Sequence, residues 1–353
     1  MKPVVVGRAS DPFGEPDMST HFVTNTEFPF EAPQKGQLRF LLSFAIQAPS
    51  GHNTQPWLFR LNEDHVDLLA DRTRALPVVD PYDRELAISC GAALDHLEVA
   101  ARNYGRELSI EICPESADAD LLARISMGNV VTDELSNDLF TAIPKRRTNR
   151  TQFEGKQIPD ALVDRCEAIA TDLGVELILI KDRIERLNVA ELVAEADRVQ
   201  FADHRFRREL ASWVHSRRRS SQDGMSGDAF GMPDMLSPIG ALVIRTFDMG
   251  KGIAAGDRKK IVDGSPMLAV FSTSNDDVRH WIAAGRALSR VLLTLAAAGA
   301  TASYLNQPIE VESLRPQLRE TVSCEGSPQL LLRFGYGTSL PPSVRRSVDE
   351  VLV

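Results

Sequence analysis

The hydrophobic and polar residues of this 353-residue chain follow two periods, and the changes between them predict its elements. Apolar residues recur every three or four positions over residues 37–47, 90–103 and 281–299, as they do on the buried faces of helices. An alternating run at residues 57–61 and a mainly apolar run at 66–70, separated by the polar turn Asn62-Glu63-Asp64, predict two strands joined as a hairpin. The pattern therefore predicts a chain that contains both helices and strands.

Shorter segments complete the prediction. Short apolar runs predict five more strands, at residues 108–112, 121–127, 175–180, 267–272 and 330–334, of which the first two end at Pro114 and Gly128. Helical spacing predicts further helices at residues 159–171 and, as one long or two shorter helices, at 183–215. A Ser before the second long helix, Ser89, is the expected N-cap of that helix.

Two of the predicted helices belong to an internal repeat. Five residues around the helix at 90–103 recur 194 positions later, around the helix at 281–299. They are Gly91, Ala93, Leu94, Gly105 and Pro114, which match Gly285, Ala287, Leu288, Gly299 and Pro308. With a separation of 209 positions, Leu122, Arg124 and Gly128 match Leu331, Arg333 and Gly337. Chance identity of small and aliphatic residues is the alternative, but the order of elements repeats too, which favours a duplication.

The repeat divides the chain into an N-terminal arm at residues 1–36, a first half at 37–140 and a second half at 141–353. The second half contains a segment at 216–264 that is rich in Gly, Ser, Met and Arg. Long irregular segments in compact domains are usually functional loops or disordered ones. This segment is predicted to be a lid over a pocket, with a surface excursion as the alternative.

Composition excludes several classes of protein. The formal net charge of −9 argues against a general binder of nucleic acid or anionic membranes. The four cysteines form no C-x-x-C motif and the seven histidines form no H-E-x-x-H motif, so neither a metal site nor a disulfide framework is expected. No run of about 20 apolar residues and no signal-peptide pattern occurs. We therefore expect a cytoplasmic protein that binds no metal.

The loop Pro49-Ser50-Gly51-His52-Asn53-Thr54-Gln55-Pro56-Trp57 is the first candidate site. Two prolines enclose residues that disfavour helix and strand interiors. Ser50, Asn53 and Gln55 each donate and accept hydrogen bonds, so they could bind the polar edge of a planar ring. A capping turn with Trp57 anchored in the core is the alternative.

The second candidate is the cluster Arg146-Arg147-Thr148-Asn149-Arg150. Guanidinium groups beside a hydroxyl are suited to a phosphate monoester, because Arg presents two donors in a fixed geometry. A solvated basic turn is the alternative. Two shorter segments are weaker candidates, namely Asn306-Gln307-Pro308-Ile309-Glu310 and the C-terminal pair Arg345-Arg346.

Together these segments resemble the nitroreductase family of flavoproteins, whose motifs are P-S-x-x-N-x-Q-P-W and R-R-S-x-R. The resemblance implies that Pro49, Ser50, Gly51, Asn53 and Gln55 lie against the isoalloxazine ring of FMN. It also implies that Arg146, Thr148 and Arg150 bind the FMN phosphate, with Arg147 beside them and Arg345 and Arg346 reaching it from the C-terminus. The turn of Gln307 and Pro308 would place a backbone N–H near flavin N5.

Each of the two main motifs occurs once, the loop in the first half and the arginine cluster in the second. Ordinary nitroreductases are homodimers that bind FMN at their interface, so the resemblance is to the internally duplicated Acg-type group. It implies an α+β nitroreductase-like fold duplicated in one chain, a pseudo-two-fold fused dimer. Antiparallel or mixed sheets would be flanked by helices around long central helices. One FMN per chain would lie between the halves.

Two functions follow from the resemblance. In the first, an FMN oxidoreductase passes a hydride from NAD(P)H to a nitroaromatic or quinone-like acceptor, with no catalytic residue assigned because the cofactor carries the hydride. In the second, the protein sequesters FMN beneath its lid with little turnover. A helical interaction protein without a cofactor is a third reading. The identity of the acceptor, the choice of NADH or NADPH, and the association of two chains stay open.

Overall fold

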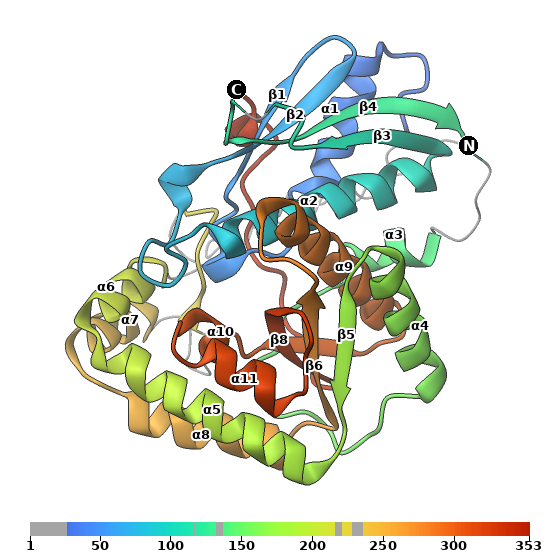
Figure 1. Cartoon of the computed structure of the whole chain (residues 1–353). Helices are drawn as coiled ribbons and strands as arrows, with labels where there is room; N and C mark the ends of the chain where they lie inside the picture. The colour runs from blue at the N-terminus through green and yellow to red at the C-terminus, as the bar shows by residue number, and fades with distance from the viewer. Residues whose placement is uncertain (1–26, 116, 132–136, 216–220, 228–235) are drawn as a thin grey trace, which may run out of the picture.

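Two antiparallel sheets lie on opposite sides of two long central helices (Figure 1). The computed structural model describes residues 27–115, 117–131, 137–215, 221–227 and 236–353. The first sheet has the order β1-β2-β4-β3, with the strands Trp57–Leu61, His65–Ala70, Leu121–Val130 and Arg106–Ile112. The second has the order β5-β6-β8-β7, with the strands Glu176–Ile180, Met267–Thr273, Ser327–Gly335 and Thr301–Tyr304.

The two sheets therefore share one strand order, in which each strand of the second sheet lies where its counterpart lies in the first. Every pairing between these named strands is antiparallel. The α+β class and the duplicated arrangement are confirmed. Of the two sheet types expected, the antiparallel one is found.

The two central helices, α2 (Arg84–Asn103) and α9 (Val278–Ala297), cross at glycines. A methyl group added at Gly91 would collide with the carbonyl oxygen of Ile282, and one added at Gly285 with that of Ile88. Gly91 and Gly285 are equivalent positions of the repeat, and so are Ile88 and Ile282, which makes the two contacts equivalent. The repeat found in the sequence therefore corresponds to a pseudo-two-fold relation in space. Only glycine allows the two backbones to approach so closely.

Two polar pairs lie near the crossing and obey the same relation. The Asp95 carboxylate lies 2.7 Å from the guanidinium of Arg290. Its counterpart joins His96 Nδ1 and Ser289 Oγ at 2.8 Å. The partners occupy equivalent positions, but one pair is ionic and the other is not, so the halves match in backbone more closely than in side-chain chemistry.

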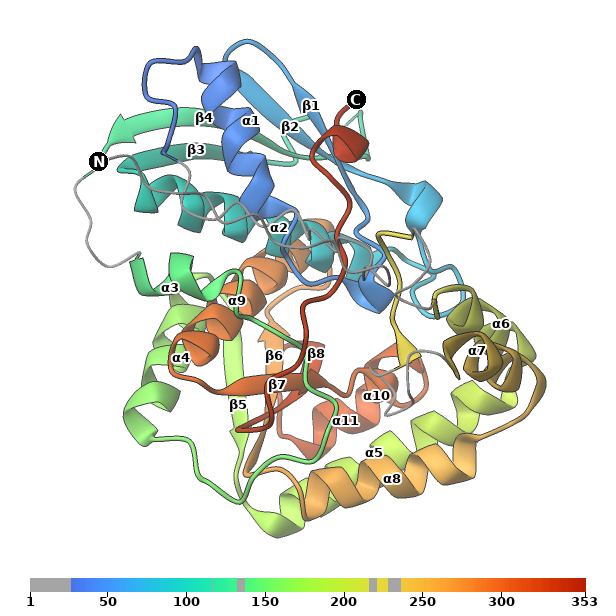
Figure 2. The ribbon, with the colours of Figure 1, turned by 180° about the vertical axis from the view of Figure 1, so that it is seen from behind.

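The other helices cover the sheets and fill the connections between strands (Figures 1 and 2). Their bounds are α1 Gln34–Ala45, α3 Asn137–Ala142, α4 Asp160–Asp172, α5 Arg183–Ala202, α6 His204–Ser212, α7 Ser237–Thr246, α8 Gly250–Val262, α10 Gln307–Glu310 and α11 Arg315–Thr321. Short 3₁₀ turns occur at Gly51–Asn53, Arg72–Arg74 and Asp349–Val351. In the part of the chain that is described, no helix is both long and apolar enough to cross a membrane.

The C-terminal segment returns from the second sheet to the first (Figure 2). Leu352 forms a parallel bridge with Phe59 of β1, and the backbone N–H of Val353 donates to the Phe59 carbonyl at 3.1 Å. Val351 is buried in the core of the first half, among side chains of α1 and α2. The last residues of the chain therefore pack on the first half.

Several expected boundaries are wrong. Helix α2 begins at Arg84, and Ser89 lies inside it rather than at its N-cap; its Oγ donates to the Glu85 carbonyl at 2.7 Å. Helix α1 begins at Gln34, within the expected N-terminal arm, of which residues 1–26 lie outside the described part. The helical pattern at 183–215 forms two helices, α5 and α6.

The expected lid segment at 216–264 is only partly irregular. It contains α7 and α8, while residues 216–220 and 228–235 lie outside the described part. The sequence did not predict α8, because the glycines at 250, 252 and 256 weaken an apolar helical period. Helices α5 to α8 together form one insertion between β5 and β6, larger than the sequence predicted.

Candidate functional site

A cavity of about 1350 Å³ contains most of the predicted site residues. The first half contributes the loop at residues 49–53 and the start of α2. The second half contributes residues 146–151, the segment from Ser303 to Gln307, and Arg345. The insertion closes the remaining side with residues of α5, α6, α7 and α8. The loop and the arginine cluster, about 100 positions apart in sequence, thus face one cavity.

The loop at 49–55 has an unusual backbone. His52, Asn53 and Gln55 have positive φ values of 48°, 57° and 53°, and they make up three of the six non-glycine residues with positive φ in the described chain. Such conformations cost roughly 1–3 kcal/mol each and persist where the surroundings impose them. Here the backbone N–H of Gln55 donates to Ser50 Oγ at 2.9 Å, and Asn53 Nδ2 donates to the Gly224 carbonyl at 2.9 Å.

Arg146 is the strongest candidate for an anion-binding residue. Its side chain is 5% exposed, and its Nε and Nη1 have no hydrogen-bond partner among the described residues. Burial lowers the pKa of this guanidinium. A buried charge that lacks a partner is strongly destabilising, so the site is built for an anion that the chain does not itself provide.

Other cations and a hydroxyl surround Arg146. Arg345 is buried, and its Nη1 donates to Asn53 Oδ1 at 2.8 Å; burial, together with the charges of Arg146 and Arg147, lowers its pKa to about 9. Thr148 forms a parallel bridge with Ala302 of β7, which fixes the position of Thr148 in the lining of the cavity. Within the described ranges, no carboxylate lies within 4 Å of Arg146, Arg150 or Arg345. The cluster therefore keeps a net positive charge.

Two neutral groups lie near the arginines. Burial and the charge of Arg150 lower the pKa of His52 to about 4, so its imidazole is neutral at pH 7. Burial raises the pKa of Tyr304 to about 12, so its hydroxyl keeps its proton. Both residues line the cavity, where they can donate or accept hydrogen bonds without adding charge.

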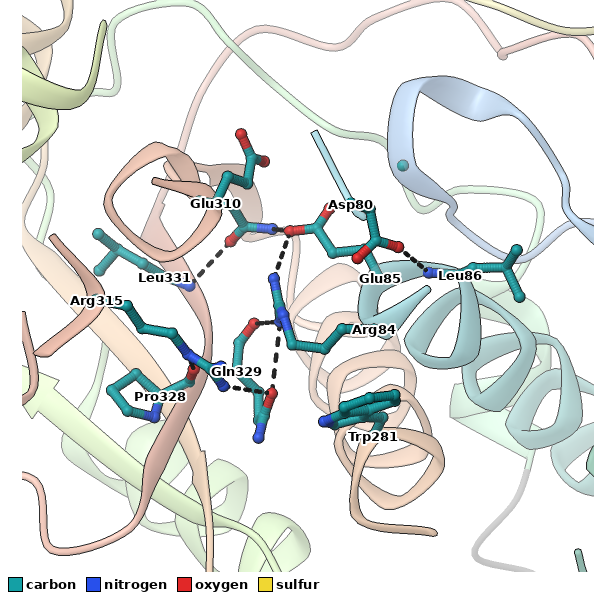
Figure 3. A network of polar contacts seen from close by, with 12 residues as sticks. Asp80, Arg84, Glu85, Leu86, Trp281, Glu310, Arg315, Pro328, Gln329 and Leu331 are labelled. Atoms are coloured by element: carbon teal, nitrogen blue, oxygen red, sulfur yellow. Dashed lines mark hydrogen bonds and ion pairs between the residues drawn. The ribbon is translucent and has the colours of Figure 1, made fainter. Parts of the chain in front are cut away.

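Buried carboxyl groups also line the cavity, where α2 meets the turn before α10 (Figure 3). Glu85 accepts hydrogen bonds from Arg84 at 2.9 Å and from Asn306 Nδ2 at 3.1 Å. The Asn306 Oδ1 accepts from the backbone N–H of Leu331 at 3.0 Å. Burial raises the pKa of Glu85 and, to a greater extent, that of Glu310. This network holds the turn at 306–307 against the first half.

The cavity includes ten of the thirteen predicted cofactor-binding residues, namely Pro49, Ser50, Gly51, Asn53, Arg146, Arg147, Thr148, Arg150, Gln307 and Arg345. The structure places Gln55, Pro308 and Arg346 outside its lining. Gln55 is fully buried and accepts from the backbone N–H of Arg346 at 2.8 Å. Arg346 in turn donates to the carbonyls of Gln55 and Glu350. Gln55 and Arg346 therefore stabilise the loop through contacts outside the cavity. Pro308 is buried in α10.

Sequence analysis missed other polar residues of the cavity, among them Tyr304, Asp197 and Arg333. Asp197 and Arg333 could have been recognised from the sequence, because each is a charged residue within an otherwise apolar helix face or strand. Asp197 lies one helical turn from Val193 on the buried side of α5, and Arg333 follows three leucines in β8. Tyr304 could not have been recognised in this way, because a tyrosine in a strand is ordinary.

The fold and the cavity define an α+β protein whose described residues place a buried, positively charged cluster and a polar loop around a shared cavity. In the described residues, no three His, Cys, Asp or Glu side chains gather as a metal site requires. No family model matches the chain. Solved structures share its fold weakly: the FMN-dependent nitroreductase NfnB from Mycobacterium smegmatis has a TM-score of 0.39 and 14% identity, covering 62% of this chain and 97% of its own.

Sequence relatives are more informative. Rv3131 of Mycobacterium tuberculosis, named as a candidate NAD(P)H nitroreductase, is 32% identical over 350 residues, which cover 98% of this chain and 96% of the relative. The protein acg of the same organism, named likewise, is 29% identical over 328 residues, covering 89% and 94%. The chain belongs to the NAD(P)H nitroreductase family of these proteins, as its loop and arginine motifs predicted.

Proposed function

We propose that this protein is a cytoplasmic, FMN-dependent oxidoreductase that takes a hydride from NAD(P)H and reduces a nitroaromatic or quinone-like acceptor. The observation that carries the proposal is the buried Arg146 guanidinium, which lacks a partner in the described chain and faces the polar loop across one cavity. The names of the relatives Rv3131 and acg support the reaction class.

The residues of the cavity fit FMN in charge and in donor type. The phosphate dianion would be held by Arg146, by the Thr148 hydroxyl, and by Arg150 and Arg345, all of which line the cavity. The ring would lie against the loop. The Asn53 side chain is already engaged by Gly224, Val344 and Arg345, so polar contact with the ring falls to Ser50 and to the loop backbone.

When bound, FMN supplies the acceptance and donation of the hydride. The chain's own residues bind, orient and exclude water. The hydrogen-bonded loop fixes the ring plane, and Glu85 and Asn306 hold the turn at 306–307 toward the cavity. His52 and Tyr304 stay uncharged at pH 7, so they add polarity beside the ring without competing for the phosphate.

The test is flavin retention in Arg146→Ala. Removal of a buried charged partner should weaken FMN binding by about 2–5 kcal/mol, which is roughly a 30-fold to several-thousand-fold loss of affinity. Binding is measured by titration of the apoprotein with FMN. The matched control is Arg205→Ala, which removes an exposed guanidinium on α6 and should leave the affinity unchanged. Unchanged affinity in Arg146→Ala would remove the phosphate assignment.

The proposal also fixes a stoichiometry. The loop and the cluster occur once each, so one chain should bind one FMN, as a pseudo-dimeric monomer that needs no second chain to complete the site. The absorbance of purified protein at the flavin and protein bands gives this ratio. A ratio near one is expected, and a ratio near two would indicate a second, unrecognised site.

A second candidate function, sequestration of FMN, is favoured by one contact. The insertion is bonded directly to the loop, since the backbone N–H of Gly224 donates to the Asn53 carbonyl at 3.2 Å and Asn53 Nδ2 donates back to the Gly224 carbonyl. A flavin beneath this contact would be shielded from NAD(P)H. Steady-state oxidation of NAD(P)H with a nitroaromatic acceptor supports the enzyme. A flavin that borohydride reduces but NAD(P)H does not would support sequestration.

A further inference from the structure

Exposed apolar side chains are concentrated on one short segment of the insertion. Eleven large hydrophobic residues are exposed in the described chain, and five of them lie within residues 236–249. These five form what we call the α7 patch, made of Leu236, Ile239, Leu242, Phe247 and Met249. Single exposed apolar residues are ordinary, but a cluster of this density marks a binding surface.

The α7 patch is continuous with the cavity. Ile239 is 58% exposed and also lines the cavity, as do Leu236 and Met249. Leu242 lies three residues beyond Ile239 on the same helix, is 63% exposed and does not line the cavity. Residues three apart are neighbours on a helix surface. One apolar strip therefore runs from the cavity out to the molecular surface.

The cavity itself has two unlike sides. The arginines and Tyr304 form a polar side, whereas Phe201, Phe206 and Leu210 continue the apolar side built by α7. Its volume of about 1350 Å³ exceeds the roughly 300–1,000 Å³ of most small-molecule sites. The cavity therefore has room for a second ring beside a flavin, and the apolar side leads outward from that room.

We propose that the electron acceptor is a quinone that carries a long aliphatic tail, with its ring in the cavity and its tail on the α7 patch. This inference rests on the proposed function. A compact nitroaromatic would leave Leu242 and Phe247 in water, whereas a tail would cover them and gain free energy with each buried methylene. The reaction balances: NAD(P)H gives a hydride, solvent gives a proton, and the quinone accepts both to become the quinol.

The experiment compares 2-methyl-1,4-naphthoquinone with its 3-decyl derivative, which shares the ring and adds only a tail. Equilibrium dialysis against the holoprotein measures binding, and NADPH oxidation measures kcat/KM. We expect the tailed quinone to bind about tenfold or more tightly. Leu242→Asp should abolish this preference without changing the affinity for the tail-less ring, because Leu242 does not line the cavity. The control is Val199→Asp, an exposed apolar residue of α5 outside the cavity, which should keep the preference.

Equal binding of the two quinones, or a preference that survives in Leu242→Asp, would overturn the proposal. Size-exclusion chromatography covers a second copy of the chain as the occupant. If Leu242→Asp dissociates a dimer and leaves the tail preference intact, the patch is an interface and the inference fails. If neither quinone is reduced while dialysis still shows a tail preference that Leu242→Asp abolishes, the proposed oxidoreductase function fails and the tail site stands.

Discussion

The two halves of the molecule share one sheet order but differ in the connections between their strands. In the first half, residues 46–56 join α1 to β1 and form the polar loop, whereas residues 173–175 join α4 to β5 in the second half. A three-residue link cannot form a loop that projects into a cavity. The comparison gives a physical reason for one loop per chain.

The connections between the first two strands of each sheet also differ in length, and here the longer one is in the second half. Residues 62–64 join β1 to β2, while residues 181–266, with four helices, join β5 to β6. The insertion supplies the apolar side of the cavity, and its counterpart in the first half is only a turn. The symmetric parts of the chain thus build the scaffold, and the asymmetric connections build the site.

The largest expected loss of stability tests the symmetric part. Gly91→Ala and Gly285→Ala each place a methyl group against a backbone carbonyl of the opposite helix, so each should lower the free energy of unfolding by about 3 kcal/mol. Urea denaturation measures both. Because the contacts are equivalent, the two losses should be similar, and a loss confined to one glycine would break the symmetry of the crossing.

The matched control is the same substitution in α8. Gly256 has nothing within 4 Å of an added methyl group, so Gly256→Ala should raise the free energy of unfolding by up to about 1 kcal/mol through helix propensity. Opposite signs at Gly91 and Gly256 would separate close packing from a general sensitivity of the protein to changes at glycine.

The sequence predicted the symmetric scaffold better than the asymmetric site. Strand β1 was predicted to the residue, because Pro56 precedes the apolar run of Trp57–Leu61 and a polar turn follows it. The 194-position repeat predicted the duplication, and the structure shows that its matched glycines Gly91 and Gly285 lie where α2 and α9 approach closely. Local pattern and spacing are sufficient for such features.

The missed features depend on tertiary contacts. The motif predicts that Gln55 binds the flavin ring. Its side chain instead accepts a hydrogen bond from the backbone N–H of Arg346, 291 positions away. The N-terminus of α2 moved to Arg84 because Asp80 Oδ2 accepts from the Leu86 N–H at 2.9 Å, which satisfies a first-turn donor from outside the helix. No short window of sequence contains either fact.

The next prediction concerns the insertion, which the first half lacks. Asp197 of α5 is buried and accepts from Gln307 Nε2 at 3.2 Å, while burial and the charge of Asp257 raise its pKa to about 7. The raised pKa means that the folded state retains a proton that the unfolded state loses above pH 4. Stability therefore falls as pH rises from about 4 to 7. Asp197→Asn should remove this loss.

The variant is therefore expected to be more stable than the parent by about 4 kcal/mol at pH 8, and nearly equally stable at pH 4, where both side chains are neutral in the folded state. Urea unfolding at the two pH values measures the difference. Lys260 and Arg198 partly oppose the effect of Asp257, because their charges lower the pKa of Asp197. A variant that is less stable at pH 8 would show that the Asp197 charge is required by the fold.

The smallest expected effect tests the loop that the second half lacks. The pKa of His52 is lowered to about 4, so the folded state resists a proton that the unfolded state takes up below pH 6.5. Stability should then fall as pH drops from 6.5 toward 4. His52→Asn removes the titration and keeps a residue that tolerates the left-handed backbone at φ 48°. Because His52 retains some exposure, the expected effect is small: between pH 6.5 and pH 5 the parent should lose about 1 kcal/mol of stability that the variant keeps.

The control, His204→Asn, changes an exposed histidine of α6 and should follow the parent curve. If His52→Asn follows the parent curve too, the acid sensitivity belongs to another buried group, such as His96 at the symmetric crossing, whose pKa burial lowers further.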